Sequence, residues 1–253
     1  MMKINKILEW LKYVLLLIIT IVVYEYLQPL VLLPFMNSLG TMPNILKSLL
    51  LIGSEILVFI VLIGIYHKLI IDNIKTFFKH PFENIGIGFV CWLLGMIGMV
   101  ICNVLITFVM GGGLSENESV NREIITKLPL YAIPAIAIFG PIIEEIVFRL
   151  SFRKIIPNKT LFIIITSIIF ASVHLIASFN SFSEILINFQ ELFHFFPYFC
   201  LALSFGFAYR NTDNICTTMF VHMMHNTYCL IIILLGMIVS WKRNLLLAEL
   251  LLF

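Results

Sequence analysis

Two adjacent carboxylates and a guanidinium interrupt a long apolar stretch of this 253-residue sequence. Glu144 and Glu145 are consecutive, and Arg149 follows Glu145 at a spacing of four residues. In a helix this spacing puts Arg149 one turn beyond Glu145, so the guanidinium can hold Glu145 while Glu144 faces a cavity. A charged group inside a membrane span costs several kcal/mol, which indicates that these residues have a function.

Histidines and an asparagine supply further polar groups within apolar segments. His174 follows Phe170 at a spacing of four residues, and His222, His225 and Asn226 lie together later in the chain. His222 and Asn226 are one helical turn apart and therefore share a face. His225 stands outside this spacing, and we interpret it as a packing or supporting residue.

These residue types could together hydrolyse a peptide bond. A carboxylate shielded from bulk water is a stronger base, so Glu144 could take a proton from water and return it to a leaving amine. His174 could orient that water, and His222 and Asn226 could donate hydrogen bonds to the oxyanion formed on the scissile carbonyl. Two carboxylates and two histidines are also a zinc-ligand set, and spacing alone does not separate the two interpretations.

A proline precedes the carboxylates, and two other acidic residues lie within apolar segments. Pro141 comes three residues before Glu144 and lacks a backbone donor, so we expect a helix distortion that opens a cavity beside the carboxylates. The alternative is that Pro134 and Pro141 only bend a packed helix. Glu25 and Glu55 match no motif, and we assign them no role.

Composition predicts an all-α membrane protein. The chain is 61% hydrophobic and 12% charged, with a mean hydropathy of +1.06. These values exclude a soluble globular domain and predict a polytopic bundle of transmembrane helices, one integral membrane domain over residues 1–253, with the site inside the bundle. No basic cluster indicates binding to nucleic acid, and the five cysteines form no metal or disulfide pattern.

The apolar segments divide into about seven to eight spans. We expect them at residues 11–33, 45–66, 85–110, 128–150, 160–179, 197–209 and 215–240. Residues 183–196 are either an interfacial helix or an extra span, and residues 241–253 either lie on the surface or form a short eighth span. A polar loop is expected at 111–127, so that three spans in residues 1–127 precede a core at 128–240 that carries the polar residues.

Loop charges predict the orientation of the chain. With the N-terminus in the cytoplasm, the inner segments hold 10 Lys and Arg residues and the outer segments hold 5. Positive residues are enriched in cytoplasmic loops, so this distribution favours a cytoplasmic N-terminus.

The polar residues resemble the motifs of a known family, the CPBP family of CAAX proteases and bacteriocin-processing enzymes, also called Abi. The matching stretches are Glu144-Glu145-x-x-x-Arg149, Phe170-x-x-x-His174 and His222-x-x-x-Asn226. Thr212-Asp213-Asn214-Ile215 also looks like the family's T-G-N-L element, with Asp213 where the family has glycine. The resemblance covers roughly residues 128–240, and the first three spans match only as hydrophobic segments.

The resemblance implies an intramembrane endopeptidase of the Rce1 type. By this resemblance Glu144 would activate water together with His174, and His222 and Asn226 would form the oxyanion site. Glu145 and Arg149 would be supporting residues. The family is often described as metalloproteases, and a metal would be held by Glu144, His174 and His222. We favour a mechanism without a cofactor, because an asparagine amide is a good oxyanion donor and a poor zinc ligand.

Two expectations concern partners and location. The substrate would be a membrane-associated peptide or protein, such as a CAAX-type protein, a bacteriocin or a pheromone precursor, cleaved within the lipid bilayer of a bacterial cell membrane. The alternative is a non-catalytic membrane scaffold or a bacteriocin immunity protein that acts by binding a partner. A scaffold has no chemical need for every catalytic residue, and all of them are present here.

Overall fold

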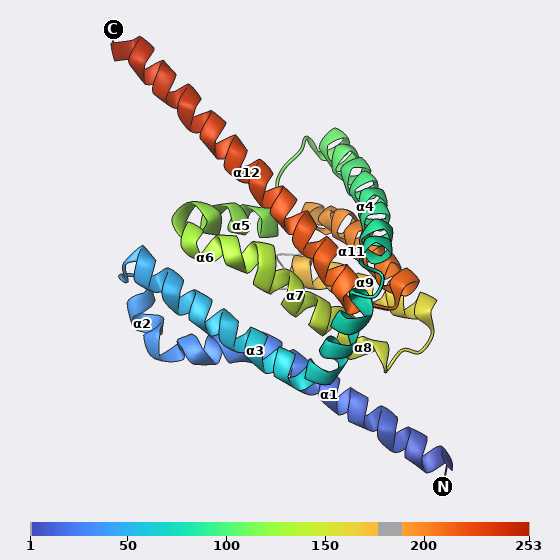
Figure 1. Cartoon of the computed structure of the whole chain (residues 1–253). Coiled ribbons are helices and arrows are strands. Elements are labelled where there is room, and N and C mark those ends of the chain that lie inside the picture. Colours follow the sequence, from blue (N-terminus) through green and yellow to red (C-terminus); the bar gives the residue numbers. More distant parts are fainter. Residues whose placement is uncertain (1, 177–188, 253) are drawn as a thin grey trace.

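Helices packed as a bundle make up the computed structural model of the chain (Figure 1). It describes residues 2–176 and 189–252, with side chains described for 5–176 and 189–240. Within these residues there is no strand, and seven helices are long and apolar enough to cross a membrane. The predicted all-α, polytopic transmembrane bundle is thereby confirmed.

The N-terminal part contains the three spans expected there. Its helices are α1 (Met2–Leu32), η1 (Leu33–Phe35), α2 (Met36–Leu39), α3 (Asn44–Phe77) and α4 (Pro81–Met110). α1 packs along α3, where the hydroxyls of Thr20 and Tyr66 lie 2.8 Å apart in a buried hydrogen bond. α4 ends at Gly111, whose left-handed φ of 79° lets its N–H close the last turn on the carbonyl of Thr107.

The segment 111–127 is not the loop that its polarity suggests, because most of it is a helix, α5 (Glu116–Lys127). Ser115 caps this helix by accepting a hydrogen bond from the backbone N–H of Glu118 at 3.2 Å. Acidic residues in the first turn and Lys127 in the last turn also suit the helix dipole. The capping pattern Ser-x-x-Glu was readable in the sequence and predicts this start.

The fourth span is broken into short pieces instead of running as one regular helix. They are α6 (Pro129–Pro134), the π-helix η2 (Ala135–Phe139), α7 (Gly140–Glu145), the π-helix η3 (Ile146–Leu150) and α8 (Ser151–Arg153). In the first wide turn the N–H of Gly140 bonds the carbonyl of Ala135, five residues earlier. A Cβ on Gly140 would lie 3.0 Å from that carbonyl oxygen, so glycine suits this turn. A distortion next to Pro141 was expected, and the structure shows it as a π-turn.

Three long helices complete the bundle. They are α9 (Lys159–Ile176), α11 (Phe195–Thr212) and α12 (Ile215–Leu252), and a 3-10 turn, η4 (Phe189–His194), precedes α11. Of the ambiguous segment 183–196, residues 183–188 lie outside the described residues. α12 continues as one helix to Leu252 and does not break into a separate eighth element. Figure 1 shows its C-terminal end and the N-terminal end of α1 extending from opposite ends of the bundle.

α11 lies between α4 and α9, and small residues allow the close approach. A Cβ on Gly95 of α4 would lie 2.4 Å from the hydroxyl of Ser204, and one on Gly206 would lie 2.8 Å from Ile163 of α9. The largest buried apolar cluster lies beside this layer and joins α3, α7, η3, α9, α11 and α12. This packing supports the broken span from several sides.

The turn before α12 holds the helix start in place. Asp213 has a left-handed φ of 49°, so the turn keeps the conformation that glycine would adopt at this position. The side-chain amide of Asn214 donates to the carbonyl of Asn73 and to the hydroxyl of Thr76, both at 2.8 Å. The carboxamide oxygen of Asn73 accepts the N–H of Ile215 at 2.8 Å. This network fixes the start of α12 against α3, two turns before His222.

Candidate active site

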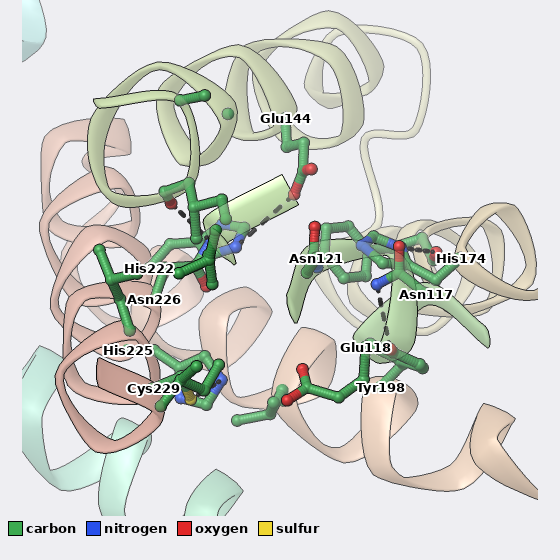
Figure 2. Close-up of a pocket in the computed structure, with 18 of the residues that line it drawn as sticks. Asn117, Glu118, Asn121, Glu144, His174, Tyr198, His222, His225, Asn226 and Cys229 are labelled. Atoms are coloured by element: carbon green, nitrogen blue, oxygen red, sulfur yellow. Dashed lines mark hydrogen bonds and ion pairs between the residues drawn. The ribbon is translucent and has the colours of Figure 1, made fainter. Parts of the chain in front are cut away.

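A cavity of about 330 Å³ lies inside the bundle and gathers polar groups from seven helical elements (Figure 2). Its polar lining residues include Glu55, Asn117, Glu118, Asn121, Tyr131, Glu144, His174, Tyr198, His222, His225 and Asn226. Four of the predicted site residues therefore line one cavity, although they come from α7, α9 and α12. The other two, Glu145 and Arg149, lie behind the cavity wall.

Glu145 and Arg149 form a fully buried ionic pair. Both side chains have 0% exposure, and the guanidinium Nε lies 3.9 Å from the carboxylate Oε2. Arg149 also donates a hydrogen bond of 3.0 Å to the carbonyl of Ala202 on α11. The remaining Oε1 of Glu145 accepts a hydrogen bond from Nδ1 of His222 at 3.0 Å. Arg149 therefore holds Glu145, and Glu145 in turn orients the imidazole of His222.

Glu144 faces the cavity, in contrast to its neighbour. Its side chain is 21% exposed, and Oε2 lies 3.6 Å from Nε2 of His222. Figure 2 shows Glu144 on the helix above the cavity, with its carboxylate pointing toward His222. Phe205 stacks on this imidazole, with ring centroids 4.6 Å apart. Consecutive residues on a helix point in different directions, which explains how one carboxylate is buried while the other reaches the cavity.

His174 lies across the cavity from His222 in Figure 2. Its Nδ1 is 2.8 Å from the carbonyl oxygen of Phe170, so Nδ1 carries a hydrogen and donates a hydrogen bond to that oxygen. Its ring packs between Phe170 and Tyr198, at centroid distances of 4.3 and 4.9 Å. In the neutral form Nε2 is then an acceptor, which suits a contact with the O–H of a water molecule.

Asn226 bonds to a neighbouring helical element, a contact that an asparagine within an apolar span also allows. Its Nδ2 donates a hydrogen bond of 3.0 Å to the carbonyl of Ile136 in η2. In the wide turn this carbonyl would pair with the N–H of the residue five positions later, which is Pro141 and has none. Asn226 supplies the missing donor, and the second N–H of its amide is left for another acceptor.

Comparison with known proteins gives a family match for the part of the chain that carries the predicted site residues. Residues 126–228 match the sequence model of the family described as type II CAAX prenyl endopeptidase Rce1-like. This part of the chain is therefore similar to the Rce1-like family. All six predicted site residues, from Glu144 to Asn226, fall within this Rce1-like segment.

A relative and the solved structures give further context. The chain is 32% identical over 123 residues to a protein of Bacillus subtilis (strain 168) named "Putative membrane peptidase YdiL". The match covers 47% of this chain and 44% of that relative, so the chain spans less than half the length of the relative it matches. No solved structure gives a significant match. Seven helices long and apolar enough to cross a membrane, together with a relative named as a membrane peptidase, indicate that the chain is an integral membrane protein.

Among the described residues of the segment 126–228, the candidate donors are not grouped as a metal site requires. Zinc sites use three or four side chains of His, Cys, Asp or Glu that converge on one point. Among residues 2–176 and 189–252, no group of three such side chains is arranged to hold a metal ion. The set considered from the sequence was Glu144, His174 and His222. Glu144 faces His222, but Nδ1 of His222 is bound by Glu145 and the ring of Phe170 contacts both histidines.

Several cavity residues could not be found from motif spacing. Asn117, Glu118 and Asn121 come from α5, which the sequence interpretation treated as a loop. Tyr198 is held by Asn117, whose amide donates to its hydroxyl at 3.1 Å. Glu55 of α3 also lines the cavity, although it matched no motif. Only its position as an acidic residue within an apolar span marked it in the sequence.

His225 also lines the main cavity, but neighbouring side chains contact both of its ring nitrogens. Trp92 donates its indole N–H to Nδ1 of His225 at 3.3 Å, and Sγ of Cys229 lies 3.6 Å from Nε2. Both nitrogens thus have partners. This arrangement fits the packing or supporting role expected for His225.

Proposed function

We propose that this chain is an intramembrane endopeptidase that hydrolyses a peptide bond in a membrane-associated peptide or protein. The observation that carries the proposal is the single cavity that Glu144, His174, His222 and Asn226 share inside a bundle of apolar helices. The Rce1-like family, whose description names a prenyl endopeptidase, and the relative named as a membrane peptidase support the same reaction class.

In this proposal Glu144 is the general base and then the general acid. Its carboxylate takes a proton from a water molecule that Nε2 of His174 orients, and the hydroxide oxygen forms a bond to the carbonyl carbon. The carbonyl π electrons move to oxygen and form an oxyanion. When the intermediate collapses, the C–N bond breaks and Glu144 gives its proton to the leaving nitrogen. Glu144 returns to its carboxylate form, so the step needs no other reactant.

His222 and Asn226 would stabilise the oxyanion. Glu145 accepts a hydrogen bond from Nδ1 of His222, which directs Nε2 toward the cavity. Nε2 of His222 would donate a hydrogen bond to the oxyanion. Asn226 keeps one N–H for the carbonyl of Ile136 and presents the other to the oxyanion. Fixed donors of this kind typically contribute 10²–10³-fold in rate.

We propose that the reaction uses no metal cofactor. The described donors do not converge in threes, and Asn226 has the chemistry of an oxyanion donor. The proposed setting is a bacterial cell membrane with the N-terminus in the cytoplasm, on the basis of the relative's source and the loop charges.

The test is cleavage of a quenched fluorescent peptide library by the purified protein in detergent or liposomes. Glu144→Gln preserves the size of the side chain but removes the base, and we expect turnover to fall by about 10²–10⁴-fold. Glu25→Gln, the same substitution at an exposed carboxylate in α1, is the matched control and should leave turnover unchanged.

A strong zinc chelator distinguishes the metal-free mechanism from a zinc-dependent one. We expect the wild-type protein to keep its activity with the chelator present. Loss of activity with the chelator and recovery with added zinc would overturn the metal-free mechanism. Unchanged cleavage by Glu144→Gln would overturn the role of Glu144. Binding of a partner without any cleavage would instead favour a scaffold.

A further inference from the structure

A second, smaller cavity adjoins the main one at Glu144. It measures about 150 Å³ and lies between α1, α3 and α7. Glu55, Gly140 and Glu144 line both cavities, so the side pocket opens into the main cavity beside the proposed base. A substrate carbonyl placed next to Glu144 would have a neighbouring side chain within reach of this pocket.

The side pocket has both polar and apolar lining residues. Tyr24 and Gln28 of α1 and Glu55 of α3 supply oxygen atoms, whereas Val58 and Ile143 supply apolar surface. The amide of Gln28 is engaged with the hydroxyl of Ser54 at 3.2 Å. A long side chain with an apolar stem and a polar tip that donates hydrogen bonds would match this lining.

Glu55 differs from the other cavity carboxylates because it lacks a charged partner. Glu118 accepts a hydrogen bond from Arg122 at 2.8 Å, and Glu144 lies 3.6 Å from His222. Glu55 forms no ion pair with any described residue, and its Oε2 is buried without a hydrogen-bond partner among them. Tyr131 supplies a hydrogen bond to the Glu55 carboxyl, but no described cation offsets its burial, and this favours a cationic ligand.

The charged residues that line the main cavity also favour a cationic ligand. Its described lining includes Glu55, Glu118 and Glu144 but no Lys or Arg. The sequence of residues 177–188, outside the described part, also contains no Lys or Arg. The described wall thus offers no Lys or Arg to receive a carboxylate group, whereas Glu55 offers a carboxylate without an ion-pair partner to receive a cation.

We propose that the side pocket selects a cationic substrate side chain, Lys or Arg, at a residue next to the scissile bond, and that Glu55 is the specificity-determining residue. This inference rests on the proposed function in taking the ligand to be a peptide. Glu55 contacts the cation, and Tyr24 accepts a hydrogen bond from it. The apolar stem of the side chain packs on Val58 and Ile143.

The experiment compares peptides that carry lysine or norleucine at each position around the cleavage site. Norleucine has the same stem without the ammonium. We expect the wild-type protein to prefer lysine at one position by about tenfold or more in kcat/KM, and Glu55→Gln to remove most of that preference by lowering kcat/KM for the lysine peptide much more than for the norleucine peptide. Glu55→Asp keeps the charge and should keep part of the preference. Glu25→Gln should keep all of it.

Binding to Glu144→Gln separates this inference from the proposed function. In one outcome the wild type cleaves no peptide, but lysine peptides bind Glu144→Gln and lose affinity when Glu55→Gln is added. The assignment of the side pocket is then correct, and the proposed peptidase function is wrong. If peptides are cleaved without preference for lysine, or if Glu55→Gln slows both peptides equally, the assignment of Glu55 is wrong and the peptidase stands.

Discussion

The first and the fourth spans of this molecule both carry carboxylates, yet they place them in opposite surroundings. In the first span only 6% of the most apolar window is buried, and Glu25 of α1 is exposed. In the fourth span 44% of that window is buried, and Glu145 has no exposure. The fourth span keeps its charge inside the protein, with Arg149 and His222 as partners.

The two spans also differ in backbone regularity. α1 is one continuous helix of 31 residues, whereas the fourth span contains two π-turns on either side of Glu144 and Glu145. An irregular backbone in a membrane needs partners inside the protein for its free carbonyls. Asn226 provides one such partner at Ile136. This difference shows that an irregular span is tolerated where neighbouring helices enclose it. The same helices also form the wall of the cavity.

The largest expected effect is the loss of the buried cation in the fourth span. Arg149→Met leaves Glu145 without the guanidinium in a site of 0% exposure, and we expect a destabilisation of about 3–5 kcal/mol. Thermal unfolding in detergent measures it. Lys127→Met, which breaks an exposed pair with Glu123 on α5, should cost no more than about 1 kcal/mol. Equal unfolding temperatures for the two variants would show that the buried pair contributes no more than the exposed pair.

The next effect concerns the contact between α12 and the π-turn. Asn226→Ala removes the donor to Ile136 and the proposed oxyanion donor, so we expect turnover to fall by about 10²–10³-fold. The unfolding free energy should fall by about 1 kcal/mol, from the single lost hydrogen bond. Both quantities are measured on the same preparation. Reduced stability with unchanged turnover would make Asn226 a helix–helix contact only.

Two Gly→Ala substitutions compare a closely packed position with an open one. Gly206→Ala puts a Cβ 2.8 Å from Ile163, and we expect a destabilisation of about 1–3 kcal/mol. Gly64→Ala in α3 meets nothing within 4 Å, so it should be neutral or stabilise the helix by up to about 1 kcal/mol. Thermal unfolding of both variants checks the pair. A larger loss for Gly64→Ala would contradict the packing described between α9 and α11.

The smallest expected effect lies at the turn before α12. Asp213 has a φ of 49°, and glycine adopts this conformation at lower cost, so Asp213→Gly should stabilise the protein by less than about 1 kcal/mol. The side chain lies 3.5 Å from Lys159, but both groups are exposed and the pair contributes little. A destabilised Asp213→Gly protein would show that this ion pair outweighs the backbone strain.

Sequence alone was sufficient for the class of fold and for the choice of candidate residues. Apolar runs long enough to cross a membrane predict helices, because the bilayer leaves backbone groups no other partner. Glu144, His174, His222 and Asn226 were selected because polar residues in such runs are costly, and the structure brings them to one cavity. The capping pattern at Ser115 could have identified α5 as well.

Other features were decided only by tertiary packing. Which of two adjacent carboxylates is buried depends on where Arg149 and His222 lie, and His222 comes 77 residues after Glu145. The donor that satisfies Ile136 comes from a helix 90 residues away. Glu55 has significance only because α3 packs beside α7 and places it at the junction of two cavities. Sequence determines the cost of each polar residue in a membrane, whereas the partner that offsets this cost is set by helix packing, since neighbours in space are distant along the chain.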